Sequence, residues 1–375
     1  MFTSRRLRSL GRRQLSIDLE RGSAPARAGT GCLIACVLSF VTACAGGITV
    51  GAGTPLVPTA SPSPQPSPTH EVPSVTPEPS STPATQGLVA EAQVAEPFSL
   101  AWSPGGEVIA VTTARGLALL QASNLSEQRL ISTDKPLEFL AFRADGDLLA
   151  TTEEGTRFLL WSMPSGDLQV EQEHTITPTY GIAFDDGGDL FLSTWGGHGD
   201  LVIRIWNVGG LNAPGGADWA VEIAIAPNGR FVALNGLNGV EVWSFEAQSL
   251  MEVLRGERAA ALQFSPDGSL LAAAHWDGVA RLWSIDSGGV VQSFVWGEAH
   301  VSGPRTGLDF SPDGHLLAVA GQEGRILVWD LERQTLLHTY AIPLRRFNSI
   351  SFSPDGKKLA SIGEDGLLQI WAVGP

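Results

Sequence analysis

The stretch SFSPDGKKLASIGEDGLLQIW, residues 351–371, contains three short apolar segments separated by two turns. The first segment leads into the turn SPDG at 353–356, the second leads into a turn with a glycine, and the third ends in Trp371. Short apolar runs bounded by Gly, Pro, Asp and Ser are typical of β-strands joined by tight turns. Two other stretches share this pattern: LQFSPDGSLLAAAHWDGVARLW at 262–283 and LDFSPDGHLLAVAGQEGRILVWD at 308–330.

The pattern is a repeat that occurs seven times between residue 86 and the C-terminus. The last glycines of the turns are 40, 42, 41, 39, 46 and 42 residues apart, and they are Gly106, Gly146, Gly188, Gly229, Gly268, Gly314 and Gly356. The third strand ends in Trp161, Trp206, Trp243, Trp283, Trp329 and Trp371, with Leu120 in that place in the first copy. A fourth, more variable strand follows, such as QTLLHTY at 334–340. Four short strands per unit of about 40–45 residues predict a propeller blade.

The three quoted stretches resemble WD repeats, and the resemblance covers residues 86–375. It implies an all-β fold, a seven-bladed β-propeller of four-stranded antiparallel blades. The last copy stops just after Trp371, and QGLVAEAQVAEPFSLAWS at 86–103 parallels QTLLHTYAIPLRRFNSISFS at 334–353. We therefore expect residues 87–94 to supply the outer strand of the last blade and to close the ring.

The repeats depart from the hydrogen-bonded set of WD repeats, in which a His, a Ser or Thr, a turn Asp and the Trp are linked. The turn Asp is present as Asp277 and Asp365, whereas a His precedes the first strand only as His174 and His300, in copies without that Asp. No copy has the full set. Apolar packing between blades is therefore expected to hold the fold together.

Charge is distributed unevenly along the chain, which has 39 acids, 24 bases and a net charge of −15. Seven arginines and two acids precede residue 44, so the remainder holds 17 bases and 37 acids, a net of −20. Affinity for phosphate backbones depends on clustered Lys and Arg, so this composition excludes nucleic acid as a partner. The three cysteines are Cys32, Cys36 and Cys44, so the rest of the chain can form no disulfide and no thiolate metal site.

Residues 1–43 have the layout of an export signal, with an arginine-rich start followed by CLIACVLSFVTA at 32–43. The residues VTA-Cys44 resemble the bacterial lipobox. This implies cleavage before Cys44, acylation of that cysteine, and anchoring to the bacterial cell membrane outside the cytoplasm. Two alternatives stay open: an uncleaved membrane anchor, and twin-arginine export through Arg5-Arg6 or Arg12-Arg13.

Residues 44–85 are rich in Pro, Ser and Thr, with ten prolines between residues 45 and 85. Such a composition lacks the apolar mass for a core, and we expect a disordered, extended tether. The predicted organisation is a signal at 1–43, a tether at 44–85 and a propeller at 86–375.

The inner strands offer little for catalysis. The residues just before their aromatic positions are Ala101, Ala141, Ala183, Ala224, Gln263, Asp309 and Ser351, which is one carboxylate in seven. No His-x-His, His-Glu-x-x-His or Gly-x-Ser-x-Gly spacing occurs. We expect no cofactor, no metal and a structural role for Asp309. The alternative is an exported propeller hydrolase of the lactonase or esterase kind.

Aromatic residues outside the strand positions, with one arginine, form the candidate binding surface. They fall in turns and links that emerge on one face in WD repeats, and this surface comprises Trp195, His198, Trp219, Trp276, Trp296, His300 and Arg305. Trp and Arg dominate interface energetics, so the expected partner is a protein or an extracellular polymer. The alternative is that these tryptophans only cap the blades.

Overall fold

The computed structural model describes residues 74–75 and 87–374, except for 155, 174–178, 198–199, 206–208, 214–222, 237–238, 248, 257, 298–306, 322–323 and 342–345. Internal contacts divide the chain into the units Met1–Ser67 and Pro68–Pro375, and every described residue belongs to the second. All regular elements in this part of the chain are β-strands. Among the residues described, no helix is long and apolar enough to cross a membrane.

Six sheets contain four antiparallel strands each. They are β3–β6 (Pro97–Trp102, Val108–Thr113, Gly116–Gln121, Glu127–Ser132), β7–β10 (Leu137–Phe142, Leu148–Glu153, Arg157–Ser162, Asp167–Glu173), β11–β14 (Thr179–Phe184, Leu190–Gly197, Asp200–Ile205, Gly209–Ala213), β15–β18 (Ile223–Ile225, Phe231–Gly236, Gly239–Ser244, Ser249–Leu254), β23–β26 (Gly307–Phe310, Leu316–Ala320, Arg325–Asp330, Thr335–Ala341) and β27–β29 with β2 (Phe347–Phe352, Lys358–Gly363, Leu367–Ala372, Leu88–Gln93). The remaining sheet contains β19–β22 (Ala259–Phe264, Leu270–His275, Val279–Ser284, Val290–Val295) and β1 (Ser74–Val75).

The prediction of seven four-stranded antiparallel blades is therefore wrong, because six blades have that form. The remaining sheet has five strands, since β1 pairs in parallel with the outer strand β22. Residues 74–75 fall inside the predicted tether, where no strand was expected. A strand can be added there because the outer strand of an antiparallel sheet leaves one row of N–H and C=O groups unpaired.

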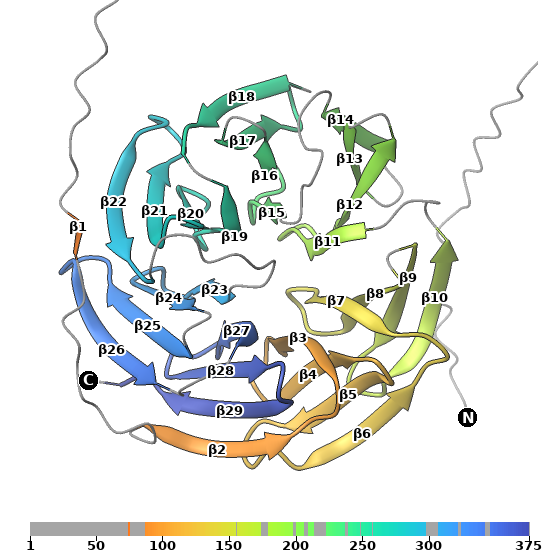
Figure 1. The fold of residues 1–375 in the computed structure, drawn as a ribbon. Coiled ribbons are helices and arrows are strands. Elements are labelled where there is room, and N and C mark those ends of the chain that lie inside the picture. The colour runs from red at the N-terminus through yellow and green to blue at the C-terminus, as the bar shows by residue number, and fades with distance from the viewer. Residues whose placement is uncertain are drawn as a thin grey trace, which may run out of the picture. The chain divides into compact units, whose positions relative to one another are not determined.

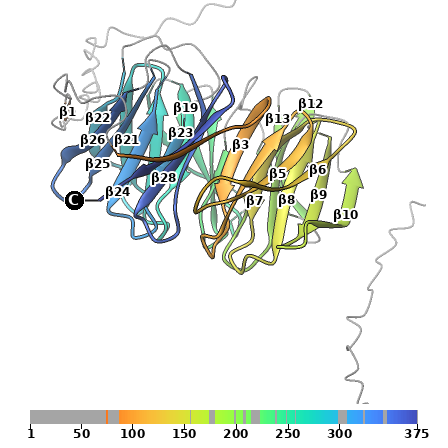
Figure 2. The ribbon, with the colours of Figure 1, turned by 90° about the horizontal axis from the view of Figure 1, so that it is seen from below.

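The sheets follow one another around a common centre, with the first strand of each sheet on the inside and the fourth on the outside (Figure 1). The strand β2 pairs antiparallel with β29, and Leu88, Ala90 and Gln93 register with Trp371, Ile370 and Leu367. The N-terminal strand thus completes the last blade as expected. In Figure 2, β28 and β3 lie side by side at this closure, and the two strands contact each other.

Contacts between neighbouring turns reinforce the closure. Gly356 and Gly106, the last residues of the first-to-second-strand turns in the last and first blades, have φ values of +69° and +79°. A Cβ on Gly106 would lie 3.8 Å from Pro354 Cδ, and one on Gly356 would lie 3.7 Å from Pro312 Cδ. Each glycine therefore meets the proline of the preceding turn. Glycine suits this position because the backbone is left-handed and a neighbouring turn lies within van der Waals reach.

Apolar packing joins neighbouring sheets, as expected from the incomplete polar set. One buried cluster joins Ile109 and Val111 of the first blade to Ile362 and Ile370 of the last. Another joins the five-stranded sheet to β23–β26 and contains Phe294, Trp296 and Trp329. The core therefore lies between the sheets, where each sheet buries both of its faces.

The outer strands share an irregularity. In six of them the register shifts by one residue opposite the end of the third strand, and the extra residues are Val89, Gln128, Gln169, Met251, Val291 and Leu337. A β-bulge of this kind increases local twist and interrupts the outer edge. Met251 is 56% exposed and Val291 is 42% exposed, so the bulges also place apolar side chains on the outer wall.

Candidate interaction surface

The connections between strands lie at two opposite ends of each sheet. In an antiparallel sheet the second-to-third-strand turn and the link to the next sheet lie at the same end, because both follow strands that run in the same direction. We call this end the link face. It contains the turn at 276–278, which joins β20 to β21 within the five-stranded sheet. It also contains the link at 255–258, which joins β18 of the neighbouring sheet to β19.

The side chains of Trp276 and Arg258 form a pair on the link face. The guanidinium carbon of Arg258 lies 5.3 Å from the centre of the Trp276 ring. The backbone N–H of Trp276 donates to the carbonyl oxygen of Arg258 at 2.9 Å, which fixes the two residues side by side. Trp276 is half-buried and Arg258 is exposed. This cation–π pair presents one aromatic face and one positive charge at the surface.

Hydrogen bonds and an ion pair close the turn that holds Trp276. Asp277 Oδ1 accepts a hydrogen bond from the Val279 N–H at 3.0 Å, and Asp277 Oδ2 lies 2.6 Å from Arg281 Nη2. Gly278 has a φ of +77°, and its N–H donates to the carbonyl oxygen of His275. The turn Asp thus closes its own turn and orients Arg281. Trp276 is therefore carried by a turn that is already ordered.

Trp296, which we expected on the same surface, lies in the core. It is 4% exposed and packs within the cluster between the five-stranded sheet and β23–β26. A Cβ on Gly321 would lie 3.2 Å from its Cε3 and Cζ3 atoms, so this glycine provides the space for the indole. The placement of Trp296 on a binding surface is wrong, because the next sheet covers it.

The side chains of the remaining predicted residues lie outside the described part of the structure. The backbone of Trp195 belongs to β12 and registers with Leu201 of β13, but its side chain is not described. His198, Trp219, His300 and Arg305 lie outside the described residues, as does Cys44. The described side chains therefore bring one predicted residue, Trp276, to the surface, together with Arg258, which the sequence pattern did not reveal. The signal that could have revealed Arg258 is its position as a basic residue in the link that leads into the sheet of Trp276.

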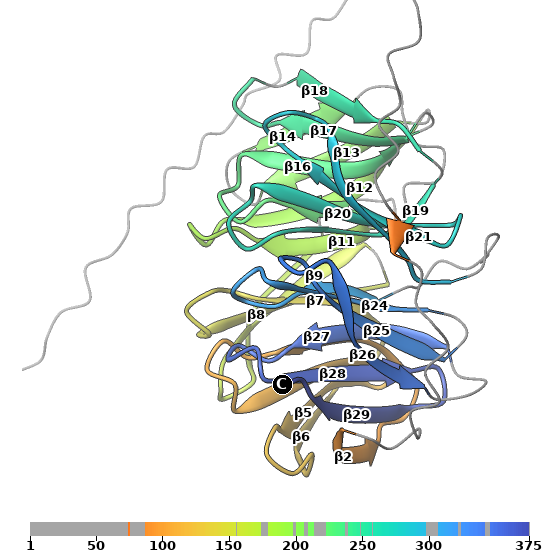
Figure 3. The ribbon, with the colours of Figure 1, turned by 90° about the vertical axis from the view of Figure 1, so that its left-hand side faces the viewer.

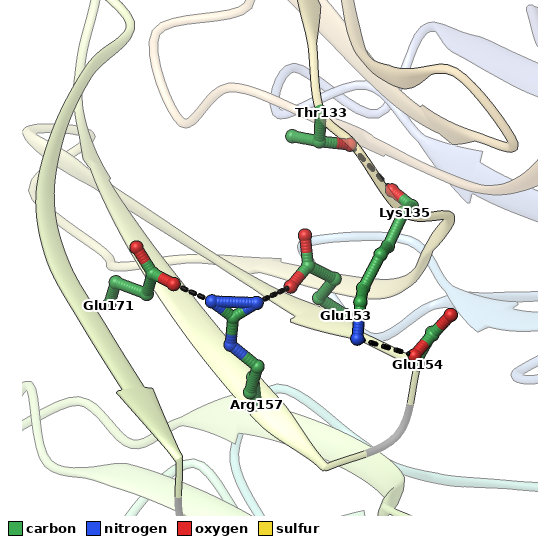
Figure 4. Close-up of polar contacts among 6 residues, drawn as sticks. All are labelled: Thr133, Lys135, Glu153, Glu154, Arg157 and Glu171. Carbon is green, nitrogen blue, oxygen red and sulfur yellow. Dashed lines mark hydrogen bonds and ion pairs between the residues drawn. The ribbon is translucent and has the colours of Figure 1, made fainter.

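A second polar group on the link face belongs to the blade β7–β10 (Figure 4). The guanidinium of Arg157 lies between Glu153 and Glu171, with Nη1 2.6 Å from Glu153 Oε2 and Nη2 in contact with Glu171 Oε1. Glu153 is 5% exposed. A buried carboxylate is destabilising unless it is paired, so Arg157 neutralises Glu153 and joins the ends of β8, β9 and β10.

The neighbouring pair is more exposed. Lys135 Nζ lies 2.7 Å from Glu154 Oε2, and the side chains are 41% and 50% exposed. The hydroxyl of Thr133 donates to the carbonyl oxygen of Lys135 at 2.6 Å and holds the link in place. Exposed pairs of this kind contribute about 0–1 kcal/mol. Thr133, Lys135 and Glu154 therefore hold the link between β6 and β7 in place and present one positive and one negative charge.

Asp309 lies on the innermost strand β23 and bonds to the next blade. Its Oδ2 accepts a hydrogen bond from the N–H of Phe352 on β27 at 2.7 Å. The carbonyl oxygen of the same peptide, on Ser351, accepts a hydrogen bond from Trp102 Nε1 of β3 at 3.0 Å. Burial raises the pKa of Asp309 to about 7. One peptide therefore links three neighbouring sheets through Asp309 and Trp102.

The groups around Asp309 are those of a packed inner strand. Ala101, Ala224 and Gln263 occupy matching positions on other inner strands, and Ser351, at the matching position of the next blade, forms a side-chain hydrogen bond with Asp309. Within the described ranges, no three His, Cys, Asp or Glu side chains gather where they could hold a metal ion. What the arrangement of Asp309 supports is a structural role.

Models of known protein families match part of the chain. The model of the Anaphase-promoting complex subunit 4 WD40 domain matches residues 222–303, and the model of the WD domain, G-beta repeat, matches residues 290–330 and 334–372. These matches support a WD-repeat propeller.

Several proteins are similar to this WD-repeat propeller over shorter stretches. Periodic tryptophan protein 2 homolog of Dictyostelium discoideum is 27% identical over 160 residues, which cover 39% of this chain and 17% of that protein. Apoptotic protease-activating factor 1 of Rattus norvegicus is 25% identical over 165 residues, which cover 42% of this chain and 13% of that protein. The chain thus spans less than a fifth of the length of these relatives.

A solved structure supports the fold. The crystal structure of the Myceliophteria thermophila Cps50 (Swd1) beta-propeller domain has a TM-score of 0.65 and 15% sequence identity, and covers 76% of this chain and 99% of that chain. At this identity the likeness concerns the fold alone.

The matched repeats are offset from the sheets. The match at 290–330 contains β22 and β23–β25, and the match at 334–372 contains β26 and β27–β29. Each repeat of this WD-repeat propeller therefore begins with the outer strand of one sheet and continues with three strands of the next. This offset explains why the last sheet lacks an outer strand until β2 provides it.

Proposed function

We propose that this WD-repeat propeller is a non-catalytic protein-binding or scaffold module, and that a lipid on Cys44 tethers it to the bacterial cell membrane outside the cytoplasm. The observation that carries the binding role is the Trp276–Arg258 pair on an ordered turn of the link face. Trp and Arg are the residues that most often anchor interfaces, and a preformed turn reduces the entropy lost on binding.

The class of partner follows from the scaffold and its charge. WD40 propellers generally bind proteins, which favours a protein over an extracellular polymer. A net charge of −15 disfavours nucleic acid. An acidic group on the partner would meet Arg258, and an apolar group would meet the indole face of Trp276.

The binding role is tested by capture from the native cell envelope. The full chain is compared with Trp276→Ala and with Arg258→Ala, and we expect both variants to lose a partner that the unchanged chain retains. The matched control is Arg230→Ala, because Arg230 also lies over an aromatic ring, that of Phe231, at 5.7 Å but belongs to a first-to-second-strand turn. Equal capture by all four proteins would refute the proposed surface. Hydrolysis of lactone or ester substrates by the purified chain would instead favour the hydrolase alternative.

The tether is tested at the cysteines. We expect mass spectrometry of the mature protein to find acylated Cys44 at the N-terminus, and Cys44→Ser to retain the signal region and release no mature form. The control is Cys36→Ser, since Cys36 follows a similar local sequence and should be processed normally. An uncleaved anchor would give membrane association and full length in both variants.

A further inference from the structure

The five-stranded sheet differs from the others because a segment far away in the sequence has joined it. Ser74 and Val75 of β1 register with Ser293 and Phe294 of β22 in parallel. Figure 1 shows β1 on the outer side of β22, and Figure 3 shows the same short orange strand with this side facing the viewer. The outer edge of β22 can therefore accept an extended peptide.

The register identifies the backbone groups that face this peptide. The N–H of Trp296, which continues β22, donates to the carbonyl oxygen of Gly278 on the β21 side at 2.8 Å. Backbone groups alternate in direction along a strand, and the pairing of β22 with β21 is regular between Gln292 and Val295. The N–H groups of Ser293 and Val295 therefore point outward, and that of Phe294 points toward β21.

The outer edge of β22 also lacks charged residues, and its bulge at Val291 precedes the residues that pair with β1. Charged residues discourage strand addition at a sheet edge. The strands β2, β6, β10 and β18 all contain Asp, Glu or Arg, whereas β22 has the sequence VVQSFV. Two other outer strands are uncharged: β14 has two glycines in five residues, and β26 donates from His338 and Tyr340 to the carbonyl oxygens of Gly374 and Ala372.

Contacts other than those with β1 also hold the backbone of β22 in place. Phe294 is 1% exposed and lies 5.3 Å from the ring of Trp329 in the next blade. Gln292 Nε2 donates to the carbonyl oxygen of Leu331 at 2.7 Å. An ordered edge loses little conformational entropy when a strand is added.

We propose that the outer edge of β22 is a docking site for an extended, uncharged peptide segment that runs parallel to it, and that the chain's own segment around Ser74–Val75 occupies this site as an intramolecular latch. The sequence of the latch fits this role. Pro73 and Pro77 bracket Ser-Val-Thr at 74–76, and proline has no N–H to donate, so the added strand stays short and exchangeable. This site is separate from the Trp276–Arg258 pair and goes beyond the proposed function.

The latch is tested by hydrogen exchange on the full chain. In Ser74→Pro/Val75→Pro we expect the amides of Ser293 and Val295 to exchange at least about tenfold faster than in the unchanged chain, while the amide of Phe294 keeps its protection. The control Ser81→Pro/Thr82→Pro adds two prolines elsewhere in the same segment and should leave all three amides unchanged. Equal exchange of Ser293 and Val295 in the unchanged chain and the latch variant would overturn the proposal.

Peptide binding provides the second test. The probe is a fluorescent peptide with the sequence of residues 72–77, VPSVTP, which contains no charged residue. It should bind the latch variant at least about tenfold more tightly than the unchanged chain, where the tethered copy competes at high effective concentration. Adding Ser293→Pro to the latch variant should abolish peptide binding, because it removes the outward N–H of Ser293. The protein should stay folded, and retained protection of the Phe294 amide from exchange verifies this. Equal peptide binding to the unchanged chain and the latch variant, or no binding to the latch variant, would refute the docking site. Partner capture from the envelope through Trp276 is a separate readout, and Ser293→Pro should not change it.

Discussion

The indole N–H of Trp371 donates to Ser361 Oγ at 3.0 Å inside the blade that both ends of the chain build. Both residues are fully buried. Trp161 donates in the same way to Thr151 Oγ1 at 3.0 Å. In contrast, Trp329 has Val319 at the equivalent position ten residues earlier, and its Nε1 has no hydrogen-bond partner among the described residues. Two blades thus retain part of the polar set of WD repeats.

Ser361→Ala should destabilise the protein by about 1–3 kcal/mol, because it leaves the buried indole N–H of Trp371 without an acceptor. Urea unfolding of the two proteins measures the difference. Ser132→Ala is the control, since Ser132 is exposed on β6, and it should change the unfolding free energy by less than about 0.5 kcal/mol. Similar effects of both substitutions would contradict the role of the Trp371–Ser361 hydrogen bond.

Deletion of residues 86–94 should lower the unfolding free energy by about 3–5 kcal/mol, because it removes β2 and exposes the edge and apolar face of β29. Thermal unfolding and urea unfolding both measure this loss. Deletion of residues 50–58, which has the same length and lies in the predicted tether, should have little effect. A chain without residues 86–94 that melts like the intact one would refute the contribution of β2 to closure.

Trp296→Ala and Trp276→Ala should have different consequences. Trp296 is buried between two sheets, so its truncation should destabilise the protein by about 3–5 kcal/mol. Trp276 is half-buried, so its truncation should be less destabilising and should act on partner capture. Urea unfolding of both variants, beside capture by the Trp276 variant, separates a core tryptophan from a surface one. Equal destabilisation by Trp296→Ala and Trp276→Ala would contradict the assignment of Trp296 to the core and Trp276 to the surface.

The stability contribution of Asp309 should decrease as the pH rises. Its pKa is raised by burial from 3.8 to about 7, so the folded state favours the protonated carboxyl. This contribution is complete below pH of about 4 and is lost as the pH rises through about 7. At roughly 1.4 kcal/mol per pKa unit the upper bound is about 4 kcal/mol, and the partial exposure of Asp309 reduces our expectation to about 2 kcal/mol.

Asp309→Asn tests this dependence. The amide oxygen can still accept the hydrogen bond from Phe352, but the side chain does not titrate. Urea unfolding at pH 4.5 and at pH 8 gives the unfolding free energy of the variant minus that of the unchanged chain. This difference should be more favourable to the variant at pH 8 than at pH 4.5. A difference between the two proteins that stays constant with pH would contradict the raised pKa.

Arg157→Met should destabilise the protein by about 3–5 kcal/mol, because Glu153 stays buried without its partner. Lys135→Met removes the exposed partner of Glu154 and should change stability by no more than about 1 kcal/mol. The two substitutions remove one charge each, so their difference in urea unfolding isolates the effect of burial. Comparable losses would show that burial of Glu153 does not control the result.

The strands were largely predictable because their signals are local. Turn glycines such as Gly314 and Gly356 need a left-handed backbone, and the tryptophans that end third strands recur at a regular spacing. The outer strand of the last blade was also predictable, since residues 86–103 align with residues 334–353. The candidate surface was less predictable, because Trp276 lies in a turn and Trp296 in a link, and neither position shows whether a neighbouring sheet covers the side chain.

From the sequence alone, the repeat, the order of strands in the six four-stranded sheets and the closure by residues 87–94 followed, because turn chemistry and alternation act between residues close in the chain. Tertiary structure decided the burial of Trp296, the raised pKa of Asp309 and the addition of β1 to β22. Each of these depends on a neighbouring sheet or on a free edge distant in sequence. Burial and edge pairing arise only when such segments come together, and no local pattern records them.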